Sequence, residues 1–196
     1  MFGGDTEVGK TLYLQRLIGN YFNEDTPSTL APYFGGTIDL EIKNLIIHFT
    51  IFDTINGIIP KAGDYIKRFL EKNNGILLLF SFPSGYRSFE NLDYCIEIMD
   101  KSSISSSNIL VLLEGTSADK KDIKVKSEDA INYAKKHNFK GYFEFSSKTG
   151  KNVYSAFEFI TYFLYQLTFE RKTKIKFKIK IYNNDKAEDD VIFSHR

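Results

Sequence analysis

The sequence predicts an α/β fold, in which a mostly parallel sheet is flanked by helices. Short apolar segments alternate along the chain with amphipathic segments of helical period, which is typical of parallel sheets. The segment GILLLFSF (75–82) is apolar at nearly every position, as expected of a strand covered on both faces. A glycine-rich segment, GGDTEVGKT (3–11), stands directly before the first helical segment. At 196 residues, we expect one domain with one sizeable core.

The elements follow from this pattern in order. We expect a helix over 11–20, then strands over 37–42 and 45–52 that are close enough in sequence for a hairpin. A buried strand over 76–82, a helix over 88–100 and a second buried strand over 109–113 come next. Ser127, followed by acidic residues, favours a capped helix over 127–137. A short strand over 142–145 and a long helix over 153–167 complete the pattern, and the aromatic face of this helix indicates core packing or, alternatively, a partner surface.

The end of the chain has a different pattern. Lys alternates with Ile or Phe in RKTKIKFKIKIYNND (171–185), and this period of two predicts a strand or an extended arm. We therefore divide the chain into a domain of residues 1–168 and a tail of residues 169–196 that is first basic and then acidic. A solvated tail or an edge strand is the simplest interpretation of the arm. The basic run from Lys172 to Lys180 supports, at most, weak and reversible electrostatic contact with an anionic membrane.

Composition excludes several classes of function. The chain has 26 Lys and Arg against 25 Asp and Glu, so nothing in its net charge indicates nucleic acid as a partner. The single cysteine, Cys95, rules out an intramolecular disulfide framework and favours a reducing, cytoplasmic setting. The three histidines are scattered without other ligands at metal-binding spacing, which argues against a metal site built from protein ligands alone.

The glycine-rich segment satisfies the P-loop pattern, Gly4-x-x-x-x-Gly9-Lys10-Thr11, and so predicts a P-loop NTPase. The glycines let backbone N–H groups curl round a phosphate, and the helix that follows directs its N-terminus at the anion. Lys10 would neutralise the β- and γ-phosphates, and the Thr11 hydroxyl would coordinate Mg²⁺. A glycine-rich turn that carries Lys-Thr by chance is the alternative. The candidate phosphate-binding residues are Gly4, Asp5, Thr6, Glu7, Val8, Gly9, Lys10 and Thr11.

Two features of this loop are unusual. Only Met1 and Phe2 precede it, whereas a phosphate loop normally follows a whole buried strand, so we expect the first strand to be largely missing and the chain to be truncated there. Glu7 places a carboxylate in an anion-binding loop, and like-charge repulsion requires it to face solvent.

Beyond the loop, four segments occur in an order that resembles the small GTPases of the Ras superfamily, and most closely the Rab branch. They are GKTLYLQRLIGNYF, STLAPYF, HFTIFDT and GILLLFSFPSGYRSFENL, and the resemblance extends from Gly3 to about Leu167. It implies a mostly parallel six-stranded sheet and GTP or GDP with Mg²⁺ as ligands. It also implies that Phe22 packs against the guanine ring, that Thr29 contacts Mg²⁺ and the γ-phosphate, and that Asp53 holds a Mg²⁺-bound water.

Two further segments resemble the motifs with which this family recognises guanine. In TSAD (116–119), Asp119 would accept hydrogen bonds from guanine N1 and N2, while Ser117 replaces a lysine whose stem covers the base. We expect this replacement to reduce nucleotide affinity. In EFSSK (144–148), Ser147 would donate its backbone N–H to guanine O6. The candidate base-binding residues are therefore Phe22, Thr116, Ser117, Asp119, Ser146, Ser147 and Lys148.

The segment DTING (53–57) departs from the family pattern. Asn56 stands where a glycine presents its N–H to the γ-phosphate, and Gly57 stands where a glutamine orients the attacking water. The candidate catalytic positions are thus Lys10, Thr29 and Gly57, where the glutamine is absent. Because positioning is a large part of phosphoryl-transfer catalysis, slow intrinsic hydrolysis is expected. The sequence supports two functions, a slowly hydrolysing GTPase switch in vesicle traffic or signalling and a pseudo-GTPase interaction module.

The resemblance also implies partners and location. We expect effectors and exchange or activating proteins to bind from Thr26 to Thr37 and from Ile55 to Arg68. The chain ends in VIFSHR, without the terminal cysteine that a prenyl anchor requires, so we expect no such anchor. A monomer is expected in the cytoplasm, with peripheral contact at cytosolic membrane faces as the alternative location.

Overall fold

The computed structural model describes residues 1–27, 33–42, 45–54, 73–83, 86–101, 110–169, 176–183 and 186–194. Thr29, Asn56 and Gly57, and the whole stretch from Ile55 to Arg68, lie outside these residues. The strands are β1 (Phe2–Gly4), β2 (Tyr33–Ile42), β3 (Leu45–Asp53), β4 (Gly75–Ser81), β5 (Leu110–Thr116), β6 (Gly141–Glu144), β7 (Lys176–Asn183) and β8 (Lys186–Ser194). The helices are α1 (Lys10–Gly19), α3 (Tyr86–Lys101), α4 (Ser127–Lys136) and α5 (Ser155–Phe169).

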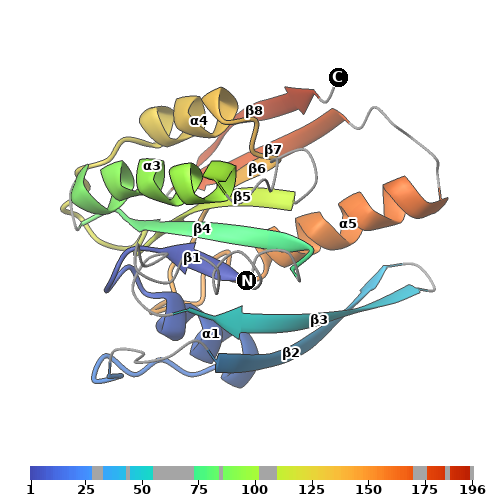
Figure 1. The fold of residues 1–196 in the computed structure, drawn as a ribbon, viewed down its shortest axis with the longest axis horizontal. Helices are drawn as coiled ribbons and strands as arrows, with labels where there is room; N and C mark the ends of the chain where they lie inside the picture. The colour runs from blue at the N-terminus through green and yellow to red at the C-terminus, as the bar shows by residue number, and fades with distance from the viewer. Residues whose placement is uncertain are drawn as a thin grey trace.

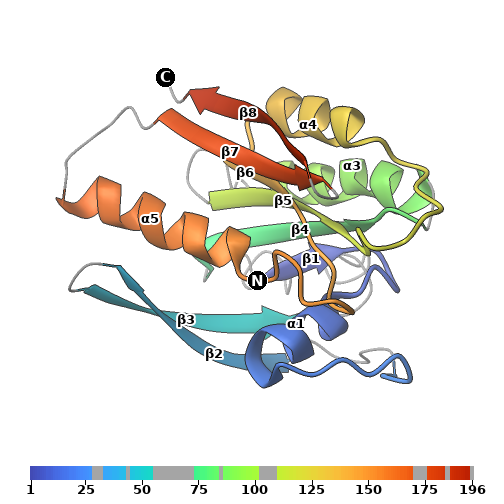
Figure 2. The ribbon, with the colours of Figure 1, turned by 180° about the vertical axis from the view of Figure 1, so that it is seen from behind.

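The centre of the molecule is a parallel sheet in the order β1-β4-β5-β6, which confirms the predicted α/β fold (Figure 1). Helices α3 and α4 cover one face of this sheet, and α1 and α5 cover the other, as the view from behind also shows (Figure 2). The near-continuous apolar run of β4 follows from this double cover. Ile76, Leu78 and Phe80 pack with α3 and α4, whereas Leu77 and Leu79 pack with α1 and α5.

The predicted hairpin is present as β2 and β3, which pair in antiparallel register from Tyr33 opposite Asp53 to Ile42 opposite Leu45. The six predicted strands of the domain are thus present. Among the described residues they form two hydrogen-bonded sheets, one of four strands and one of two. The Thr54 hydroxyl donates to the Phe2 carbonyl at 2.9 Å and joins the end of the hairpin to β1.

Strand β1 has three residues, in keeping with the expectation of a short first strand. It pairs with β4, Phe2 opposite Leu77 and Gly4 opposite Leu79. The Phe2 ring is fully buried and stacks on Tyr13 of α1, with ring centroids 4.9 Å apart. Aromatic packing therefore helps to hold this short strand in place, together with its few ladder hydrogen bonds.

A buried carboxyl lies next to this aromatic cluster. Glu114 of β5 has no exposed surface, and its Oε1 lies 3.5 Å from the Tyr13 hydroxyl, which also donates to the Val153 carbonyl at 3.0 Å. Burial raises the pKa of the Glu114 carboxyl to about 8, against smaller lowering effects of Tyr13 and the chain's amino group. The carboxyl is therefore mostly neutral at pH 7.

The predicted N-cap of α4 is wrong. Ser127 does not cap α4, because the N-cap is Lys126 and no side chain caps the helix. The Ser127 side chain instead forms a hydrogen bond with Tyr142 of β6.

The alternating tail is extended, as predicted: β7 pairs with β8 in an antiparallel hairpin beside β6. No helix among the described residues is both long and apolar enough to cross a membrane.

Candidate functional site

Most of the predicted site residues that the structure describes lie at or just after the carboxyl ends of four strands. The phosphate loop follows β1, Asp53 ends β3, Thr116 ends β5, and Ser146 to Lys148 follow β6. The arrows of β1 and β3 point to the left in Figure 1, where α1 also begins. Open α/β sheets bind their ligands in the crevice outside the carboxyl ends of the strands. The fold therefore gathers segments that are far apart in sequence at the edge where a ligand is expected.

The phosphate loop is shaped by backbone conformations that favour glycine. Gly4 has φ +129, and a Cβ added to it would lie 2.2 Å from the Leu79 carbonyl oxygen. Gly9 has φ 92 and stands directly before α1, so the loop turns into the helix at this residue. Glu7 has φ 59 and is exposed, as its charge requires. The loop thus presents the N-terminus of a ten-residue helix to an anion while the Glu7 carboxylate faces solvent.

Lys10 lies across the opening of this loop. Its side chain is 6% exposed, and its Nζ donates to the carbonyl oxygens of Gly4 at 3.1 Å and Asp5 at 2.6 Å. Burial lowers the pKa of the Lys10 ammonium, and the nearby Asp53 carboxylate partly offsets this effect. The arrangement places a desolvated cation where it would meet a phosphate.

The loop is also tied to α3 by a contact that the sequence did not indicate. Asp5 Oδ1 accepts from the Thr6 backbone N–H at 2.8 Å, and Asp5 Oδ2 accepts from Asn91 Nδ2 at 2.6 Å. Asn91 comes from a helix that packs on the opposite face of the sheet from α1. The loop is therefore held from both sides.

The two described residues predicted to serve Mg²⁺ lie next to each other. Thr11 Oγ1 donates to Asp53 Oδ2 at 2.7 Å, and Asp53 has no exposed surface. A hydroxyl and a carboxylate are the hard oxygen ligands that Mg²⁺ prefers, and Mg²⁺ takes few protein ligands when substrate phosphates and water supply the rest. Among the described side chains no group of three or more His, Cys, Asp or Glu could hold a metal ion.

A cavity of about 210 Å³ lies beside the phosphate loop and brings the predicted base-binding residues together. Gly9 is the residue of the phosphate loop that lines this cavity. The predicted residues that line it are Gly9, Phe22, Thr116, Ser117, Asp119, Ser147 and Lys148, and Leu12, Glu24 and Lys120 complete its wall. Ser146 lies behind the lining, 1% exposed.

Hydrogen bonds fix the orientation of this wall. Ser146 Oγ donates to Asp119 Oδ1 at 2.5 Å and itself accepts from the Thr149 backbone N–H at 3.1 Å. Thr116 Oγ1 donates to the Val8 carbonyl at 2.6 Å, which links this cavity directly to the phosphate loop. Ser117 has φ 60 and so adopts a left-handed conformation that is uncommon for a residue other than glycine.

Two charged residues that contact the loop after β6, Arg16 and Glu24, were missed by the sequence analysis. Arg16 of α1 donates from Nε to the Ser147 carbonyl at 2.6 Å and from Nη2 to the Lys148 carbonyl at 2.8 Å. Glu24 forms an ion pair with Lys148 at 2.8 Å and so connects the segment after α1 to the loop after β6. Neither residue belongs to a local motif, since both depend on contacts across more than 100 positions in the chain.

The strand order, the phosphate loop and the adjoining cavity define a P-loop nucleotide-binding domain of the α/β class. A family model described as "Ras family" matches residues 1–166, and the chain therefore belongs to the Ras family. This membership makes it a guanine-nucleotide-binding GTPase of the type that switches traffic or signalling through effector and regulator proteins.

Similar proteins of known name are Ras-related proteins of the Rab type. The chain is 26% identical to the Ras-related protein RABA1b of Arabidopsis thaliana over 172 residues, which cover 87% of this chain and 76% of that protein. It is 26% identical to the Ras-related protein Rab-11B of Dictyostelium discoideum over 171 residues, 87% of this chain and 74% of that protein. It is also 26% identical to Rab-32D of the same organism over 154 residues, 76% of this chain and 66% of that protein.

Proposed function

We propose that this chain is a slow molecular switch of the Rab type, which binds GTP and GDP with Mg²⁺ in the site described above. In this proposal the phosphates lie in the loop from Gly4 to Thr11, and the base fills the cavity between Phe22 and Asp119. The observation that supports the proposal is that the cavity lined by Phe22 and Asp119 also includes Gly9 of the phosphate loop, while Thr116 Oγ1 donates to the Val8 carbonyl of that loop. Thr11 and Asp53 would hold Mg²⁺, which would neutralise phosphate charge.

The binding part of this proposal is tested with a fluorescent GDP analogue in the presence of Mg²⁺. We expect saturable binding that unlabelled GDP displaces and ADP does not, because in this proposal Asp119 reads the base. Chelation of Mg²⁺ should accelerate release of the analogue. If the fluorescent GDP analogue does not bind with Mg²⁺ present, the proposal is wrong.

Hydrolysis separates the switch from its alternative, a pseudo-GTPase interaction module. We expect single-turnover hydrolysis of GTP to be slow, because Gly57 has no side chain to orient water. Replacing Gly57 by Gln should raise the rate by about one to two orders of magnitude, within the range of general acid–base and positioning effects. Gly57→Ala is the matched control and should not raise it. If Gly57→Gln binds GTP normally and hydrolyses it no faster, the interaction module is favoured.

We further propose that Arg16 positions the loop that reads the base. Its two hydrogen bonds to the carbonyls of Ser147 and Lys148 orient that peptide segment, so that the Ser147 N–H can face the cavity. In Arg16→Met both donors are lost while the length of the side chain is kept. Hydrogen bonds from a charged group contribute about 1.5–3 kcal/mol, so we expect GDP affinity to fall about tenfold or more.

The measurement for Arg16→Met is the dissociation rate of the fluorescent GDP analogue, taken together with the melting temperature of the nucleotide-free protein. Arg16→Lys serves as the conservative control and should restore part of the affinity. A melting temperature that falls while the dissociation rate stays unchanged would show that Arg16 only stabilises the fold.

Partners and location complete the proposal. Effectors and regulators would bind from Thr26 to Thr37 and from Ile55 to Arg68. These two segments contain Thr29, Asn56 and Gly57, the positions expected at the γ-phosphate. Only residues 26, 27 and 33–37 of these segments are described, and the last five belong to β2. A monomer that acts in the cytoplasm or at cytosolic membrane faces fits the family, with the domain ending near residue 168.

A further inference from the structure

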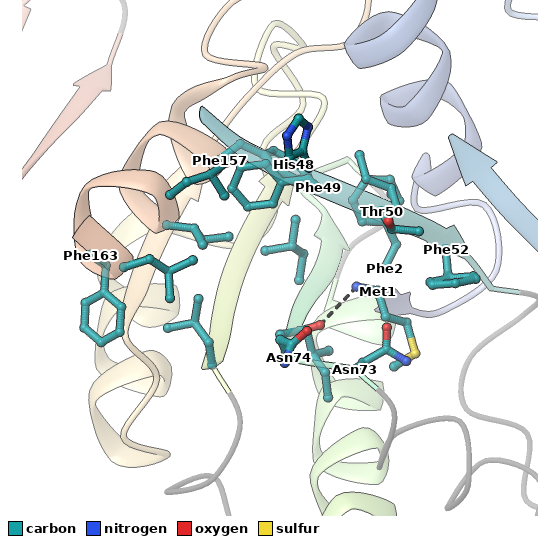
Figure 3. A pocket seen from close by; sticks show the side chains of 18 residues that line it. Met1, Phe2, His48, Phe49, Thr50, Phe52, Asn73, Asn74, Phe157 and Phe163 are labelled. Atoms are coloured by element: carbon teal, nitrogen blue, oxygen red, sulfur yellow. Dashed lines mark hydrogen bonds between the residues drawn. The ribbon is translucent and has the colours of Figure 1, made fainter. Parts of the chain in front are cut away.

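The cavity beside the phosphate loop, of about 210 Å³, differs in its charge from a larger cavity of about 470 Å³ (Figure 3). The larger cavity is lined by residues of β3, β4 and α5, with aromatic rings such as Phe49 and Phe157, and its described lining contains no Asp, Glu, Lys or Arg. The smaller cavity is lined by four such residues, Glu24, Asp119, Lys120 and Lys148. Charged groups therefore set the smaller cavity apart.

Three of these residues, Glu24, Lys120 and Lys148, form a charged rim at the mouth of the smaller cavity. They come from three different segments, which follow α1, β5 and β6. All three are exposed, whereas Thr116 and Ser147 of the same lining are buried. The rim therefore lies at the solvent side of the cavity.

Glu24 is the negative centre of this rim. Lys148 Nζ donates to Glu24 Oε1 at 2.8 Å, a contact between residues 124 positions apart in the chain. This hydrogen bond and then the charge of Lys148 lower the pKa of the Glu24 carboxyl, and the charge of Lys120 lowers it further. Glu24 thus interacts with a lysine from each of the two other segments.

The segments that carry the rim are also held by hydrogen bonds of their own. The turn after α1 is closed by the Thr26 N–H, which donates to the Asn23 carbonyl at 3.2 Å, and Thr26 Oγ1 lies 3.0 Å from Gln15 Oε1 of α1. In the loop after β5, the Lys120 N–H donates to the Ser117 carbonyl at 3.0 Å. The rim contacts therefore join separately anchored segments across the mouth of the cavity.

We propose that Glu24 is a clamp residue, which holds the mouth of the smaller cavity closed over the base of a bound nucleotide and so slows its release. This inference rests on the proposed function, in which the base lies between Phe22 and Asp119. Glu24 follows Phe22 by two positions, and Lys120 follows Asp119 directly. The two walls are thus tied together next to the residues that would contact the base, and the rim contacts break before the base leaves.

The exposure of the rim sets the size of the expected effect. The Glu24 side chain is 63% exposed and that of Lys148 is 51% exposed. Water and salt screen such a pair, so its loss changes a rate by about two- to fivefold and not by orders of magnitude. The clamp therefore adjusts the lifetime of the bound nucleotide, whereas the groups inside the cavity set its identity.

The test measures release of the fluorescent GDP analogue from the full chain with Mg²⁺ present. Glu24→Gln removes the charge and keeps the shape of the side chain, and we expect it to release the analogue about two- to fivefold faster. Raising the salt concentration from about 0.02 to about 0.5 M shortens the screening length about fivefold and should reduce this difference. The melting temperature of the nucleotide-free protein measures any separate effect on the fold.

A double-mutant cycle with Lys148→Met isolates the contact itself. The combined variant should release the analogue little faster than Lys148→Met alone, because Glu24 has then lost its closest partner. Glu97→Gln and Lys101→Met, alone and together, are the matched control. That exposed ion pair lies on α3 and does not line the smaller cavity, so release should be unchanged.

Each outcome decides between the clamp and the proposed function. Unchanged release from Glu24→Gln, or additive effects in the cycle, overturns the clamp and leaves the proposed function supported, because GDP still binds. A lower melting temperature without faster release also overturns it, since Glu24 then acts on the fold alone. A chain that takes up neither GDP nor GTP overturns the proposed function and the clamp with it.

Discussion

Replacing Gly4 by alanine is expected to destabilise the domain by about 3–5 kcal/mol, the sum of a strained backbone and an overpacked contact. The residue has φ +129, and an added Cβ would lie 2.2 Å from the Leu79 carbonyl oxygen and 3.1 Å from its carbonyl carbon. Because these are backbone atoms, the overlap with the added Cβ is removed only if β1 moves away from β4. A loss of this size is a large part of the roughly 5–15 kcal/mol that stabilises a typical domain.

The measurement is the midpoint of urea unfolding, together with GDP binding at a denaturant concentration where both proteins are folded. Gly3→Ala is the matched control, because its Cβ would first meet the end of the Leu78 side chain, at 2.9 Å, which has room to adjust. We expect a smaller loss there. A Gly4→Ala protein as stable as Gly3→Ala would contradict the close approach of β1 to β4.

Asp119→Asn is expected to change the base that the protein prefers. In the proposed site the Asp119 carboxylate, oriented by Ser146 Oγ at 2.5 Å, accepts from two guanine N–H groups. An amide in its place presents one donor and one acceptor, which matches xanthine and mismatches guanine. Because a buried polar group left without its partner costs several kcal/mol, we expect GDP affinity to fall by about 10²-fold or more while affinity for xanthosine diphosphate rises.

Competition against a fluorescent nucleotide measures both affinities on one sample. Asp122→Asn is the control, since that carboxylate is exposed and does not line the base cavity. If Asp119→Asn lowers binding of both nucleotides equally, the residue supports the loop and does not read the base.

The parts of the fold that could be predicted are those set by local pattern. The apolar run of β4 required a strand covered on both faces, and the structure packs its alternate residues against α1 and α5 or α3 and α4. The glycine spacing required a loop that turns into a helix, which is the conformation seen at Gly9. In the site, Gly9, Phe22 and Asp119 meet at one cavity as the motif order implied.

What could not be predicted depends on contacts between distant residues. Arg16 and Glu24 reach the loop after β6 through side chains whose partners no local pattern identifies. Ser127 has the residue type and position of a helix cap, but the nearby Tyr142 hydroxyl takes its hydrogen bond instead.

The neutral carboxyl of Glu114 links the stability of the domain to pH. Its pKa is about 8 in the folded chain and near its ordinary value of 4.5 in the unfolded chain, so folding takes up a proton between these two values. The stability that the neutral form contributes is fully present below about pH 4.5 and is lost as the pH rises through about 8. A mildly alkaline pH therefore destabilises the core of this protein at a residue that lies next to the hydroxyl of Tyr13 in α1, the helix that follows the phosphate loop.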